Sequence, residues 1–264
     1  MEELILIKLG GSIITDKNKE FVAKEDNIKR LAKEIKKSQK VFFGKIIIGH
    51  GAGGFAHVPA KKYKTKDGII NSKSLIGMTI TEKAARQLND ILTNEFVKEN
   101  LPIFPFSPAS FLLSDAQSYS NSYFDPIKKA LEINAIPVVY GDVIMDKKQG
   151  FTIFSTEKVF NVLVRELVKF YKIRIILVSD VDGVYNKDGV TIPVITDKNF
   201  DQLKESIVGA KGTDITGGML HKVEESLKLA KEFGVETLIV NGKRPWNLLK
   251  AVKGEKTLST LIKL

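Results

Sequence analysis

Short apolar segments alternate with helix-length amphipathic segments along the whole chain of 264 residues. The segment Arg174–Val178 is typical of a strand buried on both faces of a sheet. The segment Lys24–Ser38 places Ile28, Leu31 and Ile35 on one face of a helix. Strands separated by helices of this length predict parallel βαβ units. We therefore expect an α/β protein with a mostly parallel sheet.

The same patterns predict the individual elements. Strands are expected at Leu4–Leu9, Lys45–Gly49, Ile103–Phe106, Ile136–Tyr140, Thr152–Phe154, Arg174–Val178, Thr237–Val240 and, at a sheet edge, Leu258–Ile262. Helices are expected at Lys24–Ser38, Thr79–Asn100, Pro126–Asn134, Thr156–Tyr171, Phe200–Ile207, Gly218–Phe233 and Pro245–Val252. No repeat or long linker interrupts the pattern, so we expect one domain over residues 1–264, with a lobe boundary near residue 150.

The chain is basic, with 41 Lys and Arg against 31 Asp and Glu and a net charge of +10. The lysines are spread over many helices without an arginine cluster or an aromatic platform, so we expect no nucleic-acid partner. A basic surface instead attracts anionic substrates. The absence of cysteine excludes disulfides and thiolate metal sites. No apolar run approaches the roughly 20 residues of a membrane span, so we expect a cytoplasmic protein without a membrane partner.

Glycine-rich loops mark the ends of several predicted strands. Lys8-Leu-Gly-Gly-Ser12 follows the first strand, and glycine lets backbone N–H groups approach an anion closely and adopt positive φ. Consecutive N–H groups form an anion-binding nest, to which a lysine adds a full positive charge. Three further loops are His50-Gly-Ala-Gly-Gly-Phe-Ala-His57, Ser179-Asp-Val-Asp-Gly183 and Asp214-Ile-Thr-Gly-Gly-Met-Leu-His-Lys222. Four such loops predict a site for a polyphosphate and a second anionic substrate.

Neither G-x-x-x-x-G-K-[ST] nor a helix-opening G-x-G-x-x-G follows the first strand, so the phosphates must be held in another way. The order and spacing of the four loops resemble the amino-acid kinase superfamily over essentially the whole chain. Within it, the loop ending in His57 resembles the H-G-G-G-x-F-G-H loop of the isopentenyl phosphate kinases, whose last histidine contacts the acceptor phosphate. The resemblance implies a three-layer αβα sandwich with the ligands at the carboxyl ends of the strands.

The resemblance also implies an activity, namely ATP-dependent phosphorylation of isopentenyl phosphate to isopentenyl diphosphate, with dimethylallyl phosphate or the free C5 alcohol as further acceptors. It implies ATP and Mg²⁺ as cofactors, an acceptor-binding lobe at residues 1–150, an ATP-binding lobe at 151–264, and a homodimer formed through the helix at Thr79–Asn100. The alternatives left open are a sister kinase acting on UMP, an amino-acid carboxylate or a phosphonate such as fosfomycin, and a nucleotide-binding sensor without activity.

Phosphoryl transfer between two polyanions needs cations and donors rather than a general base. The resemblance implies catalytic roles for Lys8, Lys17, His57 and Lys222. It implies that ATP is bound by Lys8, Gly10, Gly11, Ser12, Gly54, Ser179, Asp180, Asp182, Gly183, Tyr185, Lys187, Gly217, Gly218 and Lys222. It implies that the acceptor is bound by Ala52, Gly53, Gly54, His57, Asp142, Ser155 and Thr156. No protein ligand to a metal is expected, because Mg²⁺ would be carried mainly by the ATP phosphates.

Two departures from the family pattern bear on the acceptor. Ala52 and Ala56 stand where the family usually carries glycine, and alanine is strained wherever φ is positive. The family segment S-G-D-D is replaced by Ser155-Thr-Glu-Lys158, which keeps one acidic group at Glu157. Asp142 is expected to orient either Lys8 or the loop that carries His57.

Overall fold

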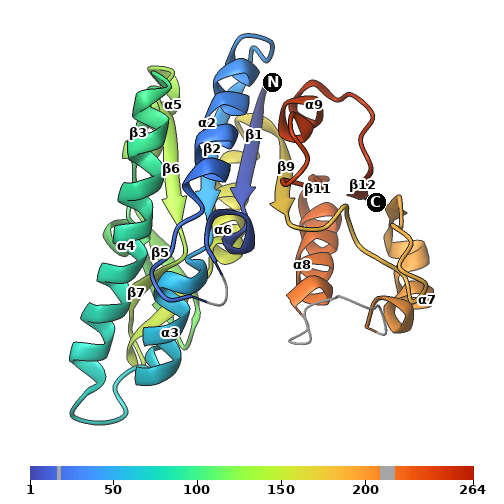
Figure 1. The fold of residues 1–264 in the computed structure, drawn as a ribbon. Coiled ribbons are helices and arrows are strands. Elements are labelled where there is room, and N and C mark those ends of the chain that lie inside the picture. Colours follow the sequence, from blue (N-terminus) through green and yellow to red (C-terminus); the bar gives the residue numbers. More distant parts are fainter. Residues whose placement is uncertain (17–18, 209–217) are drawn as a thin grey trace.

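The computed structural model describes residues 1–16, 19–208 and 218–264, and these confirm the α/β class (Figure 1). The large sheet has the order β10 (Val194–Ile195), β12 (Ser259–Ile262), β11 (Glu236–Asn241), β9 (Tyr171–Ser179), β1 (Glu2–Leu9), β2 (Lys45–His50), β6 (Ile136–Tyr140) and β3 (Ile103–Pro105). The pair β11–β12 is antiparallel and the other neighbouring pairs are parallel. The carboxyl ends of the central strands therefore meet along one edge.

A smaller sheet of four strands lies beside the large one. Its order is β5 (Ser118–Ser122), β4 (Leu112–Asp115), β7 (Asp142–Asp146) and β8 (Gly150–Phe154). The α-helices are α1 (Gly11–Ile14), α2 (Glu25–Gln39), α3 (Gly53–Tyr63), α4 (Ser74–Lys98), α5 (Asp125–Glu132), α6 (Thr156–Leu167), α7 (Asp197–Val208), α8 (Gly218–Phe233) and α9 (Asn247–Lys253). Two 3₁₀ helices are η1 (Thr65–Asp67) and η2 (Pro108–Ser110). None of the helices in these described ranges is long and apolar enough to cross a membrane.

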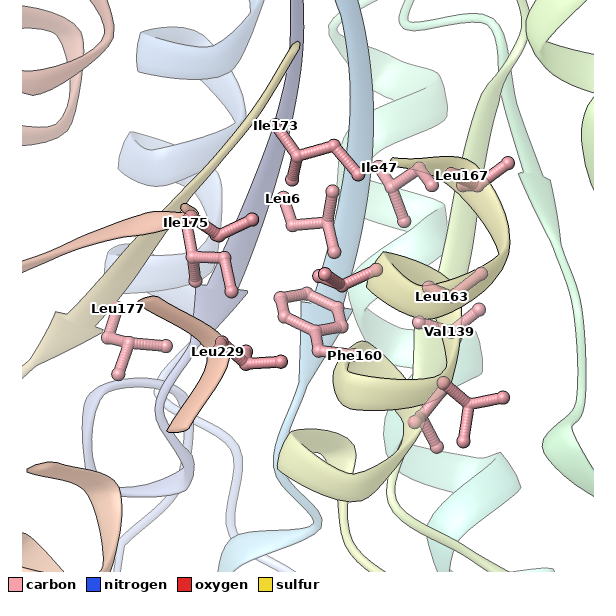
Figure 2. Packing of buried hydrophobic residues seen from close by; sticks show 14 of the residues in the cluster. Leu6, Ile47, Val139, Phe160, Leu163, Leu167, Ile173, Ile175, Leu177 and Leu229 are labelled. Carbon is pink, nitrogen blue, oxygen red and sulfur yellow. The ribbon is translucent and has the colours of Figure 1, made fainter. Parts of the chain in front are cut away.

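The alternation of side chains along the central strands builds the three layers. Leu4 and Leu6 of β1 pack in one buried cluster with residues of α5, α6 and α8 (Figure 2). Ile5 and Ile7 point to the other face and pack with residues of α2, α4 and α9. Each fully buried side chain of this size contributes about 1.5–3 kcal/mol of transfer free energy. The sheet is thus covered on both faces, as the three-layer sandwich requires.

Several expected elements were wrong in extent. The helix expected to reach Tyr171 ends at Leu167, because Tyr171 already pairs with Glu2 of β1 as the first residue of β9. The helix expected from Thr79 begins at Ser74. Its Gly77 lies against Tyr63, where a side chain would clash, because a Cβ atom on Gly77 would lie 2.4 Å from Cβ of Tyr63. The strand expected at an edge, β12, is followed by β10 in the sheet order.

Two features were not expected at all. Most of the smaller sheet escaped the sequence patterns, since β4 and β5 are short and largely polar. Their connecting turn places Ala116 and Gln117 at φ +48° and +65° without a glycine that would have marked it. Helix α3 was expected only as a glycine loop, although it runs for 11 residues. The division into lobes at residue 150 stays a prediction.

Candidate active site

The glycine turn after β1 lies at the carboxyl edge of the large sheet, close to the loops that follow β2 and β9. The amide of Gly10 donates to the carbonyl of Val178 in β9 over 2.9 Å. A Cβ on Gly10 would lie 2.7 Å from that carbonyl oxygen, and one on Gly11 would lie 2.8 Å from Cα of Gly53. Gly10 has φ −63°, so close packing of the loops, and not a positive φ as expected, is what requires glycine here.

The loop after β2 turns directly into α3, which lies at the foot of the strands in Figure 1. Gly53 has φ +48°, and a Cβ there would lie 2.0 Å from Oγ1 of Thr15. The amide of Gly54 donates to the same Oγ1 over 3.1 Å. Ala52 has φ −76° and Ala56 lies within the helix, so neither alanine carries the strain that the family pattern suggested. Both pack in a small buried cluster with Ala84, Ala85 and Tyr140.

Lys8 forms a short and largely buried ion pair. It is only 7% exposed, and its Nζ donates to Oε1 of Glu157 over 2.6 Å. Burial alone would raise the pKa of Glu157, but the charge of Lys8 and its hydrogen bond outweigh burial and lower the pKa to about 2. Glu157 therefore stays ionised and holds the ammonium group of Lys8 in place.

Lys222 lies in the first turns of α8, near the Lys8–Glu157 ion pair. Lys8, Glu157 and Lys222 line one small cavity of about 20 Å³ between α6 and α8. The positive charge of Lys222 also contributes to the low pKa of Glu157. Gly218 begins α8, four residues before Lys222. Two lysines that are 214 positions apart in the sequence (8 and 222) thus converge on one carboxylate.

A hydrogen bond from Oγ of Ser12 to Oδ1 of Asp180, over 3.0 Å, ties the loop after β9 to the glycine turn. The carbonyl of Ser179 accepts from the amide of Gly242, which follows β11, over 2.7 Å. These contacts bring together the loops after β1, β9 and β11.

Asp182 is held by the loop after β11. Nε and Nη2 of Arg244 donate to its two oxygens over 2.6 and 2.8 Å, and Nδ2 of Asn241 donates to Oδ1 over 2.9 Å. Partial burial would raise the pKa of Asp182, but these hydrogen bonds and the charge of Arg244 outweigh it and keep the pKa below its ordinary value. The carboxylate of Asp182 thus fixes the shape of the loop.

The remaining residues expected at the nucleotide lie just beyond. The hydroxyl of Tyr185 accepts from the amide of Asp182 over 3.1 Å. Gly183 has extended backbone, and a Cβ there would lie 2.4 Å from Oγ1 of Thr260. Lys187 is exposed, and its amide donates to Oγ of Ser206 over 3.1 Å.

The two histidines of the α3 loop differ in their surroundings. His57 is exposed on α3. His50 is fully buried, stacks on Tyr140 at 5.3 Å and pairs its Nε2 with Oδ1 of Asn89 at 3.2 Å. Burial lowers the pKa of His50 to about 4, so its ring is neutral. The ring packs beneath the loop between β2 and α3.

Asp142 does not contact Lys8. Its carboxylate accepts from Oγ of Ser107 over 2.7 Å and from the amide of Val143 over 2.8 Å. Burial raises the pKa of Asp142 to about 6 despite these hydrogen bonds. Glu157, and not Asp142, is thus the carboxylate that contacts Lys8, and the alternative, that Asp142 orients the loop carrying His57, stays a prediction.

Ser155 and Thr156 begin α6. The Oγ of Ser155 caps the helix by accepting from the amide of Lys158 over 3.3 Å. The hydroxyl of Thr156 is buried and donates to the carbonyl of His50 over 2.7 Å. This hydrogen bond joins α6 to the end of β2. A glycine at position 156, as in the family segment, would leave the His50 carbonyl without this donor. Lys17 and Gly217 lie outside the described residues.

Comparison with known proteins gives the family. The model of the amino acid kinase family matches residues 3–241. Isopentenyl phosphate kinases of Methanothermobacter thermautotrophicus and Methanocaldococcus jannaschii are 35% and 33% identical, over 98% and 96% of this chain and the same shares of their own. This chain belongs to the amino acid kinase family. A solved isopentenyl phosphate kinase structure with 31% identity superposes with a TM-score of 0.83 and covers 99% of this chain and 100% of its own.

Family membership makes the protein a kinase, an enzyme that transfers a phosphoryl group, and confirms the resemblance found in the sequence. Sequence reasoning noted the acidic group at Glu157 but did not place it in the site. A signal was available, because an acidic residue in the first turn of a helix after a strand lies at the edge where ligands bind. Arg244 was also missed, and nothing in its local sequence marks it. Within the described ranges, no three His, Asp or Glu side chains are grouped as a metal site requires.

Proposed function

We propose that this kinase transfers the γ-phosphoryl group of ATP to isopentenyl phosphate, giving isopentenyl diphosphate and ADP. One observation carries the proposal: Lys8 and Lys222 converge on Glu157 at the strand edge that also carries the α3 glycine turn and His57. The relatives with at least 30% identity over nearly the whole chain are named isopentenyl phosphate kinases, and this favours that acceptor over UMP, an amino-acid carboxylate or fosfomycin.

The chemistry needs little from the protein beyond charge and alignment. An oxygen of the acceptor phosphate forms a bond to the γ-phosphorus, and the bond from that phosphorus to the β–γ bridging oxygen breaks. The acceptor dianion is already nucleophilic, so no residue has to remove a proton. Lys8 contacts the oxygens between the two reactants, and Glu157 holds it there. His57 donates to the acceptor phosphate from α3.

The nucleotide would lie along the loops after β1, β9 and β11. Lys222 reaches the β- and γ-phosphates, and the first amides of α8 add the partial positive charge of a helix N-terminus. Gly11, Ser12 and Gly218 supply backbone donors. Gly10 and Gly54 act by keeping the loops close together, since their amides donate to the carbonyl of Val178 and to Oγ1 of Thr15. Ser179, Asp180, Asp182, Gly183, Tyr185 and Lys187 shape the adenosine end. Lys17 and Gly217 keep their predicted roles at the phosphates.

The cation and the acceptor residues complete the proposal. The lysines and amides described above suit phosphate oxygens, so the residues present fit Mg²⁺·ATP, in which the metal is held by the nucleotide and offsets its charge. Ala52, Gly53, Gly54 and Ser155 line the acceptor phosphate. Thr156 and Asp142 act there through the backbone that they hold, since both side chains are engaged inside the protein.

The enzyme is further proposed to be a cytoplasmic homodimer formed through α4. Val97 on α4 is 61% exposed, and Phe104 on the last strand of the large sheet, β3, is 56% exposed. Two copies of such apolar surface can cover each other. Light scattering coupled to size exclusion should give twice the chain mass, and a monomer at micromolar concentration would contradict this part.

The function is tested by ADP release from Mg²⁺·ATP with a panel of acceptors: isopentenyl phosphate, dimethylallyl phosphate, isopentenol, UMP, acetylglutamate and fosfomycin. We expect the highest kcat/KM with isopentenyl phosphate. A higher value with UMP, acetylglutamate or fosfomycin would replace the proposed acceptor and leave the ATP site in place. ATP binding without turnover on any acceptor would indicate a sensor.

A further inference from the structure

Helices α6 and α8 are joined by two side-chain bridges along their contact. In the first, Nδ2 of Asn161 donates to Oε2 of Glu225, and both side chains are half-buried. In the second, Nη2 of Arg165 lies 2.9 Å from Oε2 of Glu232, and both side chains are exposed, at 46% and 37%. The two bridges link the same pair of helices at different distances from the active site.

The Asn161–Glu225 bridge lies one helical turn from the reactive groups. Asn161 follows Glu157 by four positions on α6, and Glu225 follows Lys222 by three positions on α8. Residues at these spacings share one face of a helix. All four side chains line the cavity of about 20 Å³ that also contains Lys8. The bridge therefore lies in the lining of the same cavity, one helical turn further along each helix than Glu157 and Lys222.

The placement of Lys222 relative to Lys8 depends on this contact. Lys8 is fixed to α6 by its 2.6 Å ion pair with Glu157. Lys222 belongs to α8, which reaches α6 through buried apolar packing, such as that of Leu229, and through the two bridges. A hydrogen bond is directional, so the Asn161–Glu225 contact adds a restraint on sliding and rotation to the apolar packing of the two helices.

We infer that Asn161 and Glu225 are positioning residues, which hold Lys222 at the distance from the Lys8–Glu157 pair that the phosphates require. The inference rests on the proposed function for its kinetic readout. It acts through the hydrogen bond, not through the charge of Glu225. A glutamine at position 225 keeps an oxygen that accepts from Asn161, so that variant separates the two effects.

The test compares Asn161→Ala, Glu225→Ala, the double variant and Glu225→Gln. Each is assayed for kcat and KM with isopentenyl phosphate and for the Kd of a non-hydrolysable ATP analogue by calorimetry. The matched controls are Arg165→Ala and Glu232→Ala, which break the second bridge of the same helix pair. Thermal unfolding of every variant identifies any that fails to fold. If Asn161→Ala does not fold, Glu225→Ala against Glu225→Gln decides.

We expect kcat to fall and the analogue Kd to rise by about tenfold in both alanine variants, as misplacement of one catalytic group predicts. The double variant should match the single ones, and Glu225→Gln and both controls should stay near wild type. Losses in the controls equal to those of Glu225→Ala, or a glutamine variant as impaired as the alanine variant, would overturn the inference. If wild type fails to use isopentenyl phosphate, the proposed function fails, while the analogue Kd still decides the role of the bridge.

Discussion

Along the sheet edge at which the substrates are proposed to bind, the buried polar groups of the two halves have pKa values shifted in opposite senses: one half favours charged forms and the other favours neutral forms. At the end of β1, Lys8 and Glu157 are both largely buried and both charged, and the pKa of Glu157 is lowered to about 2. At the ends of β2 and β6, burial shifts the pKa of His50 to about 4, of Asp142 to about 6 and of Tyr140 to about 12. In this second half every shift favours the neutral form.

The difference lies in the partners. Glu157 faces an ammonium group, which more than offsets the cost of burying its charge. The side-chain hydrogen-bond partners of His50, Tyr140 and Asp142 are the neutral groups of Asn89 and Ser107, so desolvation dominates, and the charge of Asp142 adds to the rise in the pKa of Tyr140. The ion pair of Lys8 and Glu157 thus lies at the proposed phosphate site, whereas the buried groups of the second half are all neutral only between about pH 4 and 6.

The largest expected effect comes from breaking the charged half at its centre. Lys8→Met removes the cation between the two reactants and leaves the Glu157 carboxylate without its partner. We expect kcat to fall by about 10³, the upper range for loss of one transition-state donor. Steady-state ADP release measures this, with the exposed Lys129→Met on α5 as control. A loss below tenfold would show that Lys8 is not in the reacting centre.

The next largest effect tests where the acceptor phosphate is held. His57→Ala should lower kcat by about 10². The Kd of the ATP analogue should stay unchanged, because His57 is proposed to contact only the acceptor. His221→Ala, which alters the other exposed histidine, is the matched control. An equal loss of ATP affinity in the His57 variant would move this residue to a structural role.

A smaller effect is expected from removing the carboxylate of Glu157. Glu157→Ala should lower kcat by about tenfold, because Lys8 loses the group that orients it. The carboxyl has a folded pKa of about 2, below its ordinary 4.5, so the stability it contributes is complete above pH 4.5 and is lost as pH falls toward 2. Denaturant unfolding at several pH values should therefore show a weaker acid dependence in the variant. An unchanged acid dependence would contradict the ion pair.

The smallest expected effect tests the raised pKa of Asp142. The folded pKa of Asp142 is about 6, above its ordinary 3.8, so its contribution to stability is complete below pH 3.8 and is lost as pH rises through 6. Asp142→Asn cannot lose a proton, so it should gain stability relative to wild type between about pH 4 and 6, by the linkage of proton binding to folding. The same unfolding series measures this. A constant difference between the two proteins would show that Asp142 is ionised without cost.

The sequence predicted the large sheet well because its central strands are buried on both faces and flanked by amphipathic helices. Of the smaller sheet it predicted only β8, as the strand expected at Thr152–Phe154. Strands β4 and β5 are held by backbone pairing and by Asp146, which accepts from Ser114 and from the amide of Gln117. Neither contact leaves a periodic pattern. The end of the helix before β9 was also missed, since pairing of Tyr171 with β1 decides it.

The candidate site was predicted in its motifs and only partly in its interactions. The glycine turns, Lys8 and Lys222 carry local signals, and the structure places them at one edge. The partner of Lys8 could not be chosen from the sequence, because Asp142 and Glu157 both follow strands that end at that edge. Arg244 could not be predicted either, because its partner Asp182 lies 62 residues away in the sequence.

The contrast between the two halves is tested most directly by carboxyl ¹³C NMR titration of the folded protein, with Glu157→Ala and Asp142→Asn used to assign the signals. The account predicts that Glu157 titrates near pH 2 and Asp142 near pH 6. If both carboxyls titrate together near pH 4, the two halves of the sheet edge do not differ in the charge of their buried carboxyls, and the contrast drawn above would be contradicted.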